Sequence, residues 1–513
     1  MVSSHTENTK RIAKNTLMLY VRMLFGMLVS LYTSRVVLNA LGVEDYGIYN
    51  VVGGFVAMFS IISGSLSASV SRFLTFELGR GDMQRLRDVF STSVLIHIVL
   101  AIVILLATES IGIWFLNTQM NIPQLRLHAA NYVFQASILS FVISLLNVPY
   151  NASIIAHERM SAYAYIGITD IILRLVVVLI IAGLSTGVDK LIVYALLLLI
   201  ERIIFQSISF FYCKKNFEEC NLFFVLNRSC WKEMSSFAGW NFIGTTSALL
   251  KDSGVNVLLN IFAGPVVNAA RGIATSVNMA VCSFSSSFMS AINPQITKSY
   301  ASGDREYMLS LSERGTRFSF YIILLFALPV ILETDFLLAF WLKQYPPHTV
   351  DFVRLVLLLS LCDVMSNTLV TMQLATGKIR DYQIVVGCMQ LMNFPLSYIC
   401  LKCGLSPESV YIIAILVSLS CLILRLFFLR KFVGLSIGKY FKNVCANVVL
   451  VMAISAIIPI VVHNALQYGW IRFVIVTSIS LICIIMVAYY VGCDKSERKF
   501  VNNKIRTFKI KLT

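Results

Sequence analysis

Apolar runs of about 20 residues recur from one end of this chain to the other, and a run of that length can cross a bilayer as a helix. Of the 513 residues, 58% are hydrophobic and only 13% are charged. Inside a bilayer the backbone polar groups must bond to one another, so only helices and closed barrels can span it. The runs lack the period-two alternation of barrel strands. We therefore predict an all-α integral membrane protein.

Fourteen of these runs are predicted to be transmembrane helices, with short loops between most of them. The polar first residues precede an apolar run long enough to span the bilayer, so we expect no cleavable signal peptide. The predicted spans are 15–38, 47–70, 90–116, 128–153, 161–184, 190–212, 236–262, 267–291, 315–341, 352–375, 382–402, 409–429, 440–463 and 470–492.

The same glycines and acids occur in two stretches that are 222 residues apart. Gly42 returns as Gly264, and the pair Gly81-Asp82 returns as Gly303-Asp304. A similar turn follows in each stretch, at 156–159 and at 376–379. Each half holds six spans, an even number, so both halves enter the membrane in the same direction. We predict two parallel six-helix repeats with a site at their interface.

The repeat and the polar stretches divide the chain into six segments. The longest internal polar stretch is too short to form a core of its own, so we read it as a linker. The segments are a cytoplasmic N-terminus (1–14), an N-lobe (15–213), a cytoplasmic linker (214–235), a C-lobe (236–430), two additional helices (431–493) and a basic cytoplasmic tail (494–513).

The net charge of +16 would suit a nucleic-acid partner, but the distribution of the charge argues against one. Most of the 42 lysines and arginines fall in alternate loops and in the tail, all on one side of the predicted membrane. The positive-inside rule then places both termini of this multi-pass protein in the cytoplasm. We expect the tail to contact anionic membrane lipids.

Nine cations lie inside or at the ends of apolar spans, where a central charge costs about 2.5–3.5 kcal/mol. Five of them lie near a span end, where the side chain can snorkel, or close to an acid on their own helix: Arg174, Arg202, Arg354, Arg425 and Arg472. We expect Arg354 to pair with Asp351 and Arg174 to pair with Asp170. The other four have no acid on the same face of their helix: Arg22, Arg35, Lys251 and Arg271. These four predict a water-filled cationic cavity, unless acids on other helices neutralise them.

Polar residues on spans seven and eight support this prediction of a cavity. Span eight carries one polar stripe, because the steps between its polar residues are three or four: Asn268, Arg271, Thr275, Asn278, Cys282 and Ser285. Span seven carries Asn256 and Asn260 on a similar face. Arginine presents a planar fork of donors that matches phosphate oxygens, so an anionic substrate is expected.

Several chemistries have no motif in this sequence. We find no phosphate-binding GxxxxGK[ST] loop, no HExxH and no zinc-type spacing, so we expect neither an enzyme nor a metal site. Cys400 and Cys403 form a CxxC at a predicted outer end, which leaves a redox role open. We expect no cofactor apart from a coupling ion.

The segment that closes the first span and opens the second resembles the start of bacterial polysaccharide repeat-unit (O-antigen type) flippases. It reads Thr33-Ser34-Arg35, then Leu41-Gly42, then Tyr46-Gly47-Ile48-Tyr49. The Gly-Asp turns, the turn at 376–378 and the fourteen spans are also similar to that family, over residues 10–430. The family belongs to the multidrug/oligosaccharidyl-lipid/polysaccharide (MOP) exporter superfamily. The first span lacks the acid that is typical of proton-coupled multidrug members.

The resemblance implies a V-shaped pair of six-helix lobes in the bacterial cytoplasmic (inner) membrane. It also implies a flippase that moves an undecaprenyl-pyrophosphate-linked oligosaccharide to the outer leaflet by alternating access, for polysaccharide or lipopolysaccharide biosynthesis. The four unpaired cations would hold the pyrophosphate, and three asparagines would bond sugar or phosphate: Asn256, Asn260 and Asn278. Four acids are candidates for coupling to H⁺ or Na⁺: Asp170, Glu201, Asp252 and Asp363. We expect a monomer, with a polysaccharide polymerase or glycosyltransferases as candidate partners.

Three alternative functions stay open at this point. A MATE-like multidrug or metabolite antiporter would need an acidic cavity, and the unpaired cations argue against one. A lipid II flippase would share the architecture. A membrane glycosyltransferase or polymerase would need catalytic acids or bases on a large outer loop, and the outer loops are short.

Overall fold

The computed structural model covers residues 2–57, 59–118, 122–184, 188–221, 227–342, 344–495, 497–499 and 502, with the backbone alone at 2–10, 31, 34, 38, 43, 50, 51, 54, 55, 57, 60 and 61. Nearly all of these residues are helical, and none of them belongs to a β-strand. The predicted all-α fold is confirmed. Residues 222–226 of the predicted linker and most of the predicted tail lie outside the described residues.

The chain forms two compact units, which we call unit 1 and unit 2. Unit 1 consists of Met1–Thr246 with Thr297–Gly303, and unit 2 of Ser247–Ile296 with Asp304–Thr513. The long helix α8 contributes to both units. The division by sequence repeat, with a linker at 214–235, is a different kind of boundary and stays a prediction.

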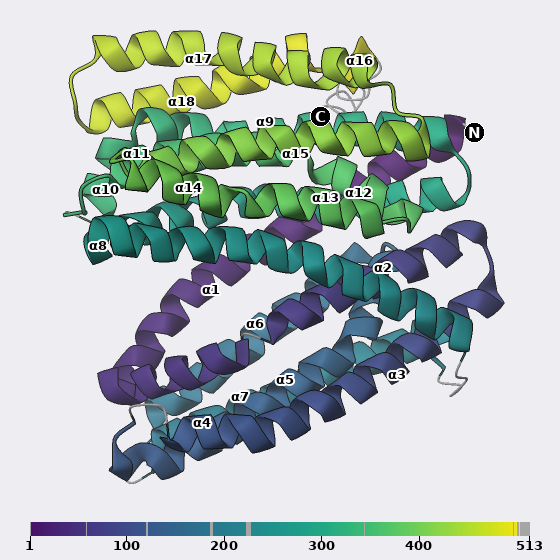
Figure 1. Cartoon of the computed structure of the whole chain (residues 1–513), viewed down its shortest axis with the longest axis vertical. Helices are drawn as coiled ribbons and strands as arrows, with labels where there is room; N and C mark the ends of the chain where they lie inside the picture. The colour runs from purple at the N-terminus through teal and green to yellow at the C-terminus, as the bar shows by residue number, and fades with distance from the viewer. Residues whose placement is uncertain are drawn as a thin grey trace, which may run out of the picture. The chain divides into compact units, whose positions relative to one another are not determined.

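Seven helices and both ends of an eighth build unit 1 (Figure 1). Helix α5 packs against α1, α2, α3 and α7, and its buried residues Ala130, Val133 and Leu145 lie in the core. The helices are α1 (Val2–Ala57), α2 (Ser60–Arg80), α3 (Met83–Ala107), α4 (Ile113–Thr118), α5 (Leu127–Ala156), α6 (Met160–Gly183), α7 (Lys190–Asn216) and α8 (Arg228–Ala301), with short turns at Thr108–Gly112, Gln124–Arg126 and Glu218–Cys220.

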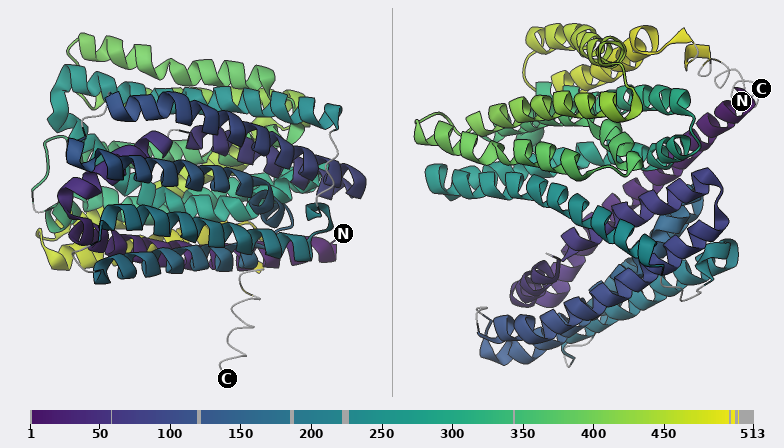
Figure 2. Two further views of the ribbon diagram at one scale, coloured as in Figure 1. Left: turned by 90° about the horizontal axis from the view of Figure 1, so that it is seen from below. Right: turned by 45° about the vertical axis from the view of Figure 1, so that its right-hand side comes forward.

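The middle of α8 and ten further helices build unit 2. Helix α15 packs against α11, α13 and α14, whereas α17 and α18, the yellow-green and yellow pair in Figures 1 and 2, pack against each other and against α9. The helices are α9 (Arg305–Leu332), α10 (Thr334–Leu342), α11 (Thr349–Val364), α12 (Asn367–Thr376), α13 (Arg380–Leu391), α14 (Asn393–Lys402), α15 (Ser409–Val433), α16 (Ile437–Tyr440), α17 (Asn447–Ala465) and α18 (Trp470–Val487), with short turns at Phe441–Ala446 and Ala488–Gly492.

Helices α1 and α8 are each interrupted by one of the two glycines that the sequence repeat predicts to be equivalent. Gly42 has φ 80° and ψ 170°, and Gly264 has φ 82° and ψ 176°. Only glycine adopts this region readily, because a Cβ atom would clash with the backbone. Each glycine therefore divides its helix into two arms.

The repeated Gly-Asp pairs also have the same local structure. Gly81 and Gly303 both adopt the left-handed conformation, at φ 75° and φ 82°. Asp82 and Asp304 then cap the next helices, since their carboxylates accept from the backbone amides of Arg85 and Tyr307 at 2.9 and 3.0 Å. The matching turns support the duplication inferred from the sequence.

Among the described residues, 12 helices are long and apolar enough to cross a membrane. Each matches a predicted span, except that Arg228–Ala301 contains two, one on either side of Gly264. The predicted span 47–70 is not among the 12, and its residues lie in the second arm of α1 and in α2. The predicted count of fourteen is therefore nearly reproduced.

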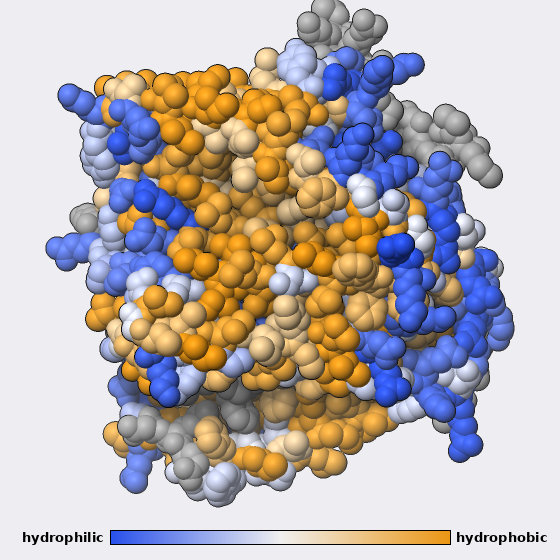
Figure 3. Space-filling view, turned by 45° about the horizontal axis from the view of Figure 1, so that its top comes forward, coloured by the Kyte–Doolittle hydropathy of each residue, from blue (hydrophilic) through white to orange (hydrophobic). Residues whose placement is uncertain are grey.

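The outer surface of α17 and α18 is apolar. Val461, Ile482 and Ile485 are 60–61% exposed. Figure 3 shows a broad hydrophobic band on the face in view, with hydrophilic residues gathered along its margins. Soluble proteins rarely expose such a surface, but a bilayer would cover it. The chain is a multi-pass membrane protein.

One predicted pairing within a helix is confirmed and another is wrong. Nε of Arg174 lies 3.5 Å from Asp170, one turn away as expected. Nη2 of Arg354 instead lies 2.9 Å from Asp335, on the preceding helix, and not beside Asp351. Spacing along one helix could not reveal an acid on a neighbouring helix.

The prediction that Arg425 and Arg472 snorkel is also wrong. Arg425 is buried, and its Nε donates a hydrogen bond of 3.1 Å to the hydroxyl of Tyr382. Nη2 of Arg472 lies 3.0 Å from Glu333, a fully buried acid that also contacts Nδ1 of His463 at 2.8 Å. These contacts tie α17 and α18 to the end of α9.

Candidate functional site

A polar pocket of about 240 Å³ lies within unit 2, and we call it the charged pocket. Both arms of α8 line it, together with α11, α14 and α15. It contains four of the predicted substrate-binding residues and two of the predicted coupling acids: Lys251, Asn256, Arg271, Asn278, Asp252 and Asp363. The structure therefore brings six of the eleven predicted site residues to one place.

The break at Gly264 explains how α8 lines the charged pocket from two sides. Lys251 and Asn256 lie on the arm before the glycine, and Arg271 and Asn278 lie on the arm after it. On the second arm, residues 271, 275 and 278 are four and three positions apart, so they share one face. The middle of the polar stripe predicted on span eight thus lines this pocket.

The two cations of the charged pocket have no direct acidic partner. Nη2 of Arg271 donates to the backbone carbonyl of Asp252 at 3.1 Å, and its Nη1 is buried and bonds to no acceptor among the described residues. No described acid lies within 4 Å of the Lys251 or Arg271 side-chain nitrogens. An unpaired guanidinium nitrogen is costly to bury, so an anionic ligand would gain from bonding to it.

Two carboxylates offset these cations. Asp252 is exposed, and Asp363 accepts a hydrogen bond from the hydroxyl of Ser418. The lining therefore holds two basic and two acidic side chains. The expectation of a purely cationic cavity is too simple for unit 2, because the acids of spans seven and ten share the pocket.

Other polar residues of the charged pocket were not singled out from the sequence. Ser360 donates to the side-chain oxygen of Asn278 at 2.6 Å, so that oxygen is already engaged. Asn393 and Tyr411 also line the pocket, and Oδ1 of Asn393 is buried without a partner among the described residues. An asparagine inside an otherwise apolar span was the signal that could have identified Asn393.

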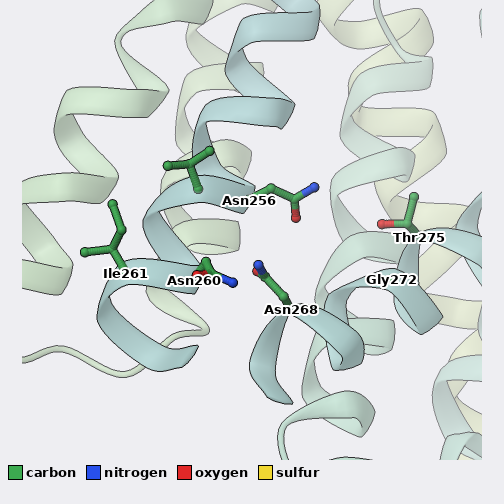
Figure 4. Close-up of a pocket in the computed structure, with 7 residues that line it drawn as sticks. Asn256, Asn260, Ile261, Asn268, Gly272 and Thr275 are labelled. Atoms are coloured by element: carbon green, nitrogen blue, oxygen red, sulfur yellow. The ribbon is translucent and has the colours of Figure 1, made fainter. Parts of the chain in front are cut away.

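A second pocket of about 510 Å³ in unit 2 lies between the two arms of α8, and we call it the carboxamide pocket. Its lining carries no charge and includes Asn256, Asn260, Asn268 and Thr275 (Figure 4). Asn256 and Thr275 also line the charged pocket. The two pockets are therefore neighbours with a shared wall.

The other two predicted cations, Arg22 and Arg35, belong to unit 1 and do not line either pocket. Arg22 packs over α6, where its Cζ lies 4.5 Å from the ring centre of Tyr163 and its side chain fills the space left by Gly167. Arg35 is exposed. No described acid pairs with either arginine, so their predicted role in substrate binding is untested and stays a prediction.

The remaining two predicted coupling acids form an ionic cluster in unit 1. Asp170 lies 3.5 Å from Arg174 and 3.6 Å from Arg202, and Glu201 lies 3.8 Å from Arg202. Glu201 is buried, and its Oε1 has no hydrogen-bond partner among the described residues. The contact with Asp170 on the neighbouring helix explains why the charge of Arg202 is tolerated in an apolar span, which its sequence neighbours alone did not explain.

No three histidines, cysteines or acids lie close enough together in the described part of the chain to hold a metal ion. Cys400 and Cys403, the CxxC of the sequence, are free thiols.

The fold is that of MATE-like transporters of the MOP superfamily. A MATE protein in its bent conformation matches with a TM-score of 0.72 at 13% identity, over 83% of this chain and 96% of its own. An outward-facing MATE multidrug resistance transporter of the MOP superfamily gives 0.71 at 14% identity, with the same coverage. A MOP superfamily transporter from Pyrococcus furiosus, with a binding pocket of reversed polarity, gives 0.66 at 14% identity, over 82% of this chain and 96% of its own.

Comparison of the sequence with known families identifies the family of this chain. The model of the family described as polysaccharide biosynthesis protein matches residues 12–300, more than half of the chain, and the chain belongs to that family. It is also similar to the uncharacterized membrane protein EpsK of Bacillus subtilis (strain 168), at 21% identity over 314 residues. That alignment spans 60% of each chain, so the chain matches less than two thirds of this relative's length.

The family and the fold agree with the resemblance found in the sequence. The chain is a member of the polysaccharide biosynthesis protein family and has a MATE-like fold.

Proposed function

We propose that this transporter is a flippase for an undecaprenyl-pyrophosphate-linked oligosaccharide, which it moves from the cytoplasmic to the outer leaflet. The product would serve polysaccharide biosynthesis, with O-antigen of lipopolysaccharide as one candidate. We place the protein in the bacterial inner membrane with both termini in the cytoplasm, because the loop cations favour that orientation. Membership of the polysaccharide biosynthesis family supports the substrate class.

One observation carries the proposal: Lys251 and Arg271 lie in one polar pocket, and no carboxylate of the described residues lies within 4 Å of their side-chain nitrogens. A cation at bilayer depth is normally paired or functional. A pyrophosphate would accept from the buried Nη1 of Arg271, the nitrogen that lacks a partner. Arg22 and Arg35 remain candidates for substrate binding within unit 1.

The acids of the charged pocket suit a coupled cycle. While Asp252 and Asp363 are ionised, they weaken the attraction of the pocket for a pyrophosphate. Binding of H⁺ or Na⁺ would neutralise them and strengthen it. We propose Asp363 as the coupling residue of the two, because it lines the pocket and a hydrogen bond from Ser418 holds its carboxylate in place. Asp170 and Glu201 would contribute in unit 1.

A second candidate function rests on the same two acids. A MATE-type antiporter would hold a cationic drug or metabolite against Asp363, and the charged pocket offers that group. The family favours the oligosaccharide carrier, and a lipid II flippase would be a close variant. As partners we propose a polysaccharide polymerase or glycosyltransferases, which would supply or consume the carried glycan, with the transporter itself a monomer.

Complementation of a flippase-deficient strain tests the proposal. We expect Arg271→Gln to reduce surface polysaccharide strongly and to leave lipid-linked oligosaccharide on the cytoplasmic side, with the variant still in the membrane. Arg87→Gln is the matched control, because Arg87 forms only an exposed pair with Glu218. Full export by Arg271→Gln, or drug efflux without export by the wild type, would overturn the proposal.

A further inference from the structure

In the proposed function the charged pocket binds the pyrophosphate, so the carboxamide pocket is left for another part of the substrate. No charged side chain lines it, although charged residues line the pocket next to it. It is also large, at about 510 Å³ against about 240 Å³ for the charged pocket. Three asparagines in a helix that spans the bilayer are costly unless something polar satisfies them. Their presence therefore calls for a ligand or water of matching chemistry.

The side chains of this pocket converge from both arms of α8. In Figure 4, the carboxamides of Asn256, Asn260 and Asn268 point into the space between the arms, and the side chain of Thr275 faces them from the second arm. Ile261 points away from this space. Oδ1 of Asn268 is buried and has no hydrogen-bond partner among the described residues. The wall of the pocket thus contains an acceptor that has no donor among the described residues.

The donor and acceptor pattern fits sugar hydroxyls. Each carboxamide offers two donors and one acceptor oxygen side by side, and vicinal hydroxyls present the same mixture. The Thr275 hydroxyl donates to the backbone of Arg271 at 2.9 Å, so its oxygen is free to accept. A phosphate would require cations, a cationic drug would require an acid, and a hydrocarbon chain would leave the amides unsatisfied.

We propose that the carboxamide pocket is the glycan subsite, where Asn260, Asn268 and Thr275 bind the first sugars of the lipid-linked substrate. This inference rests on the proposed function, in which the charged pocket holds the pyrophosphate. The shared wall of Asn256 and Thr275 lets one molecule occupy both pockets. Lys251 and Asn260 are nine residues apart, about 14 Å along a helix, which leaves room for a pyrophosphate and its first sugar.

The substrate therefore binds in one orientation. Its pyrophosphate lies toward Lys251, and its glycan lies toward the break at Gly264. Selectivity among glycans then resides in the carboxamides, whereas the affinity common to all pyrophosphate lipids resides in the charged pocket.

Two probes separate these contributions. The purified protein in nanodiscs is titrated with bare polyprenyl pyrophosphate and with the same lipid carrying the oligosaccharide of the host cell. We expect the wild type to bind the glycosylated probe more tightly. Asn260→Ala and Asn268→Ala should each weaken that binding about three- to tenfold, the effect of one lost hydrogen bond, and leave the bare probe unaffected. Unchanged binding of the bare probe also establishes that each variant is folded.

Two control variants complete the design. Arg271→Gln should weaken both probes, because it removes the phosphate contact. Ser276→Ala should change neither, because Ser276 follows Thr275 on α8, donates to Gly272 and does not line the pocket.

The possible failures are distinguishable. Equal affinity of the wild type for the two probes, or asparagine variants that keep the full preference for the glycosylated probe, would overturn the glycan subsite and leave the flippase proposal standing. No binding of either probe by the wild type would overturn both.

Discussion

Nζ of Lys298 lies 2.7 Å from Oε1 of Glu158, although the two residues are 140 positions apart in the chain. The other carboxylate oxygen lies 2.8 Å from Nη2 of Arg11, and the Glu158 side chain is only 1% exposed. Asn15 donates to the backbone carbonyl of Glu158 at 3.3 Å. One buried carboxylate thus joins the first turns of α1, the turn after α5 and the end of α8 within unit 1.

We expect Glu158→Gln to destabilise this junction by about 2 kcal/mol, because Lys298 and Arg11 would keep their charges without the buried partner. Thermal unfolding in detergent measures the loss. Arg87→Gln serves as the control, since exposed pairs contribute about 0–1 kcal/mol. Equal melting temperatures of Glu158→Gln and wild type would show that Glu158 does not hold the junction.

The breaks in α1 and α8 predict a loss of stability when either of their glycines is replaced. Gly42→Ala and Gly264→Ala should each cost about 1–3 kcal/mol, because their φ and ψ angles suit only glycine. Neither new Cβ would touch another atom within 4 Å, so backbone strain is the whole cause. Gly239→Ala, at a helical position with similar open space, should be neutral or stabilising in the same unfolding measurement. A similar loss for all three variants would contradict this reading.

Glu497, near the end of the described residues, should make the stability of the protein depend on pH. Burial raises the pKa of Glu497 above its ordinary value of 4.5, although the Arg317 guanidinium, 2.7 Å away, opposes the shift. The folded protein therefore keeps a proton that the unfolded chain releases first. The contribution of Glu497 to the free energy of unfolding is therefore lost as the pH rises from 4.5 through the raised pKa.

Comparison with Glu497→Gln isolates that group. The difference in melting temperature, wild type minus variant, should fall as the pH is raised from 4.5 to about 7. A difference that rises with pH would mean that the pairing with Arg317 outweighs the burial.

The sequence predicted the parts of the fold that depend on local chemistry. Hydrophobic runs give the helices, and Gly42 and Gly264 have no side chain to prevent their unusual angles. The sequence could not predict which residues on different helices form ion pairs. Arg354 meets Asp335 and Arg472 meets Glu333, because packing and not spacing decides which acid lies within reach.

The candidate site divides in the same way. Periodicity along α8 indicated that Arg271 and Asn278 share a face, and both line the charged pocket. It could not indicate that Ser360 would engage Asn278, or that Asp363 would enter the same pocket from α11. Those contacts depend on how α11 packs against α8, which a single-helix pattern does not contain.

The most direct test is the rate at which purified protein in sealed vesicles moves a polyprenyl-pyrophosphate oligosaccharide across the bilayer. We predict that Arg271→Gln and Lys251→Gln each slow this movement about tenfold, the effect of one lost charge-assisted hydrogen bond to phosphate, while Arg87→Gln moves it at the wild-type rate. Wild-type rates in both Arg271→Gln and Lys251→Gln would contradict the central claim that the charged pocket binds the pyrophosphate.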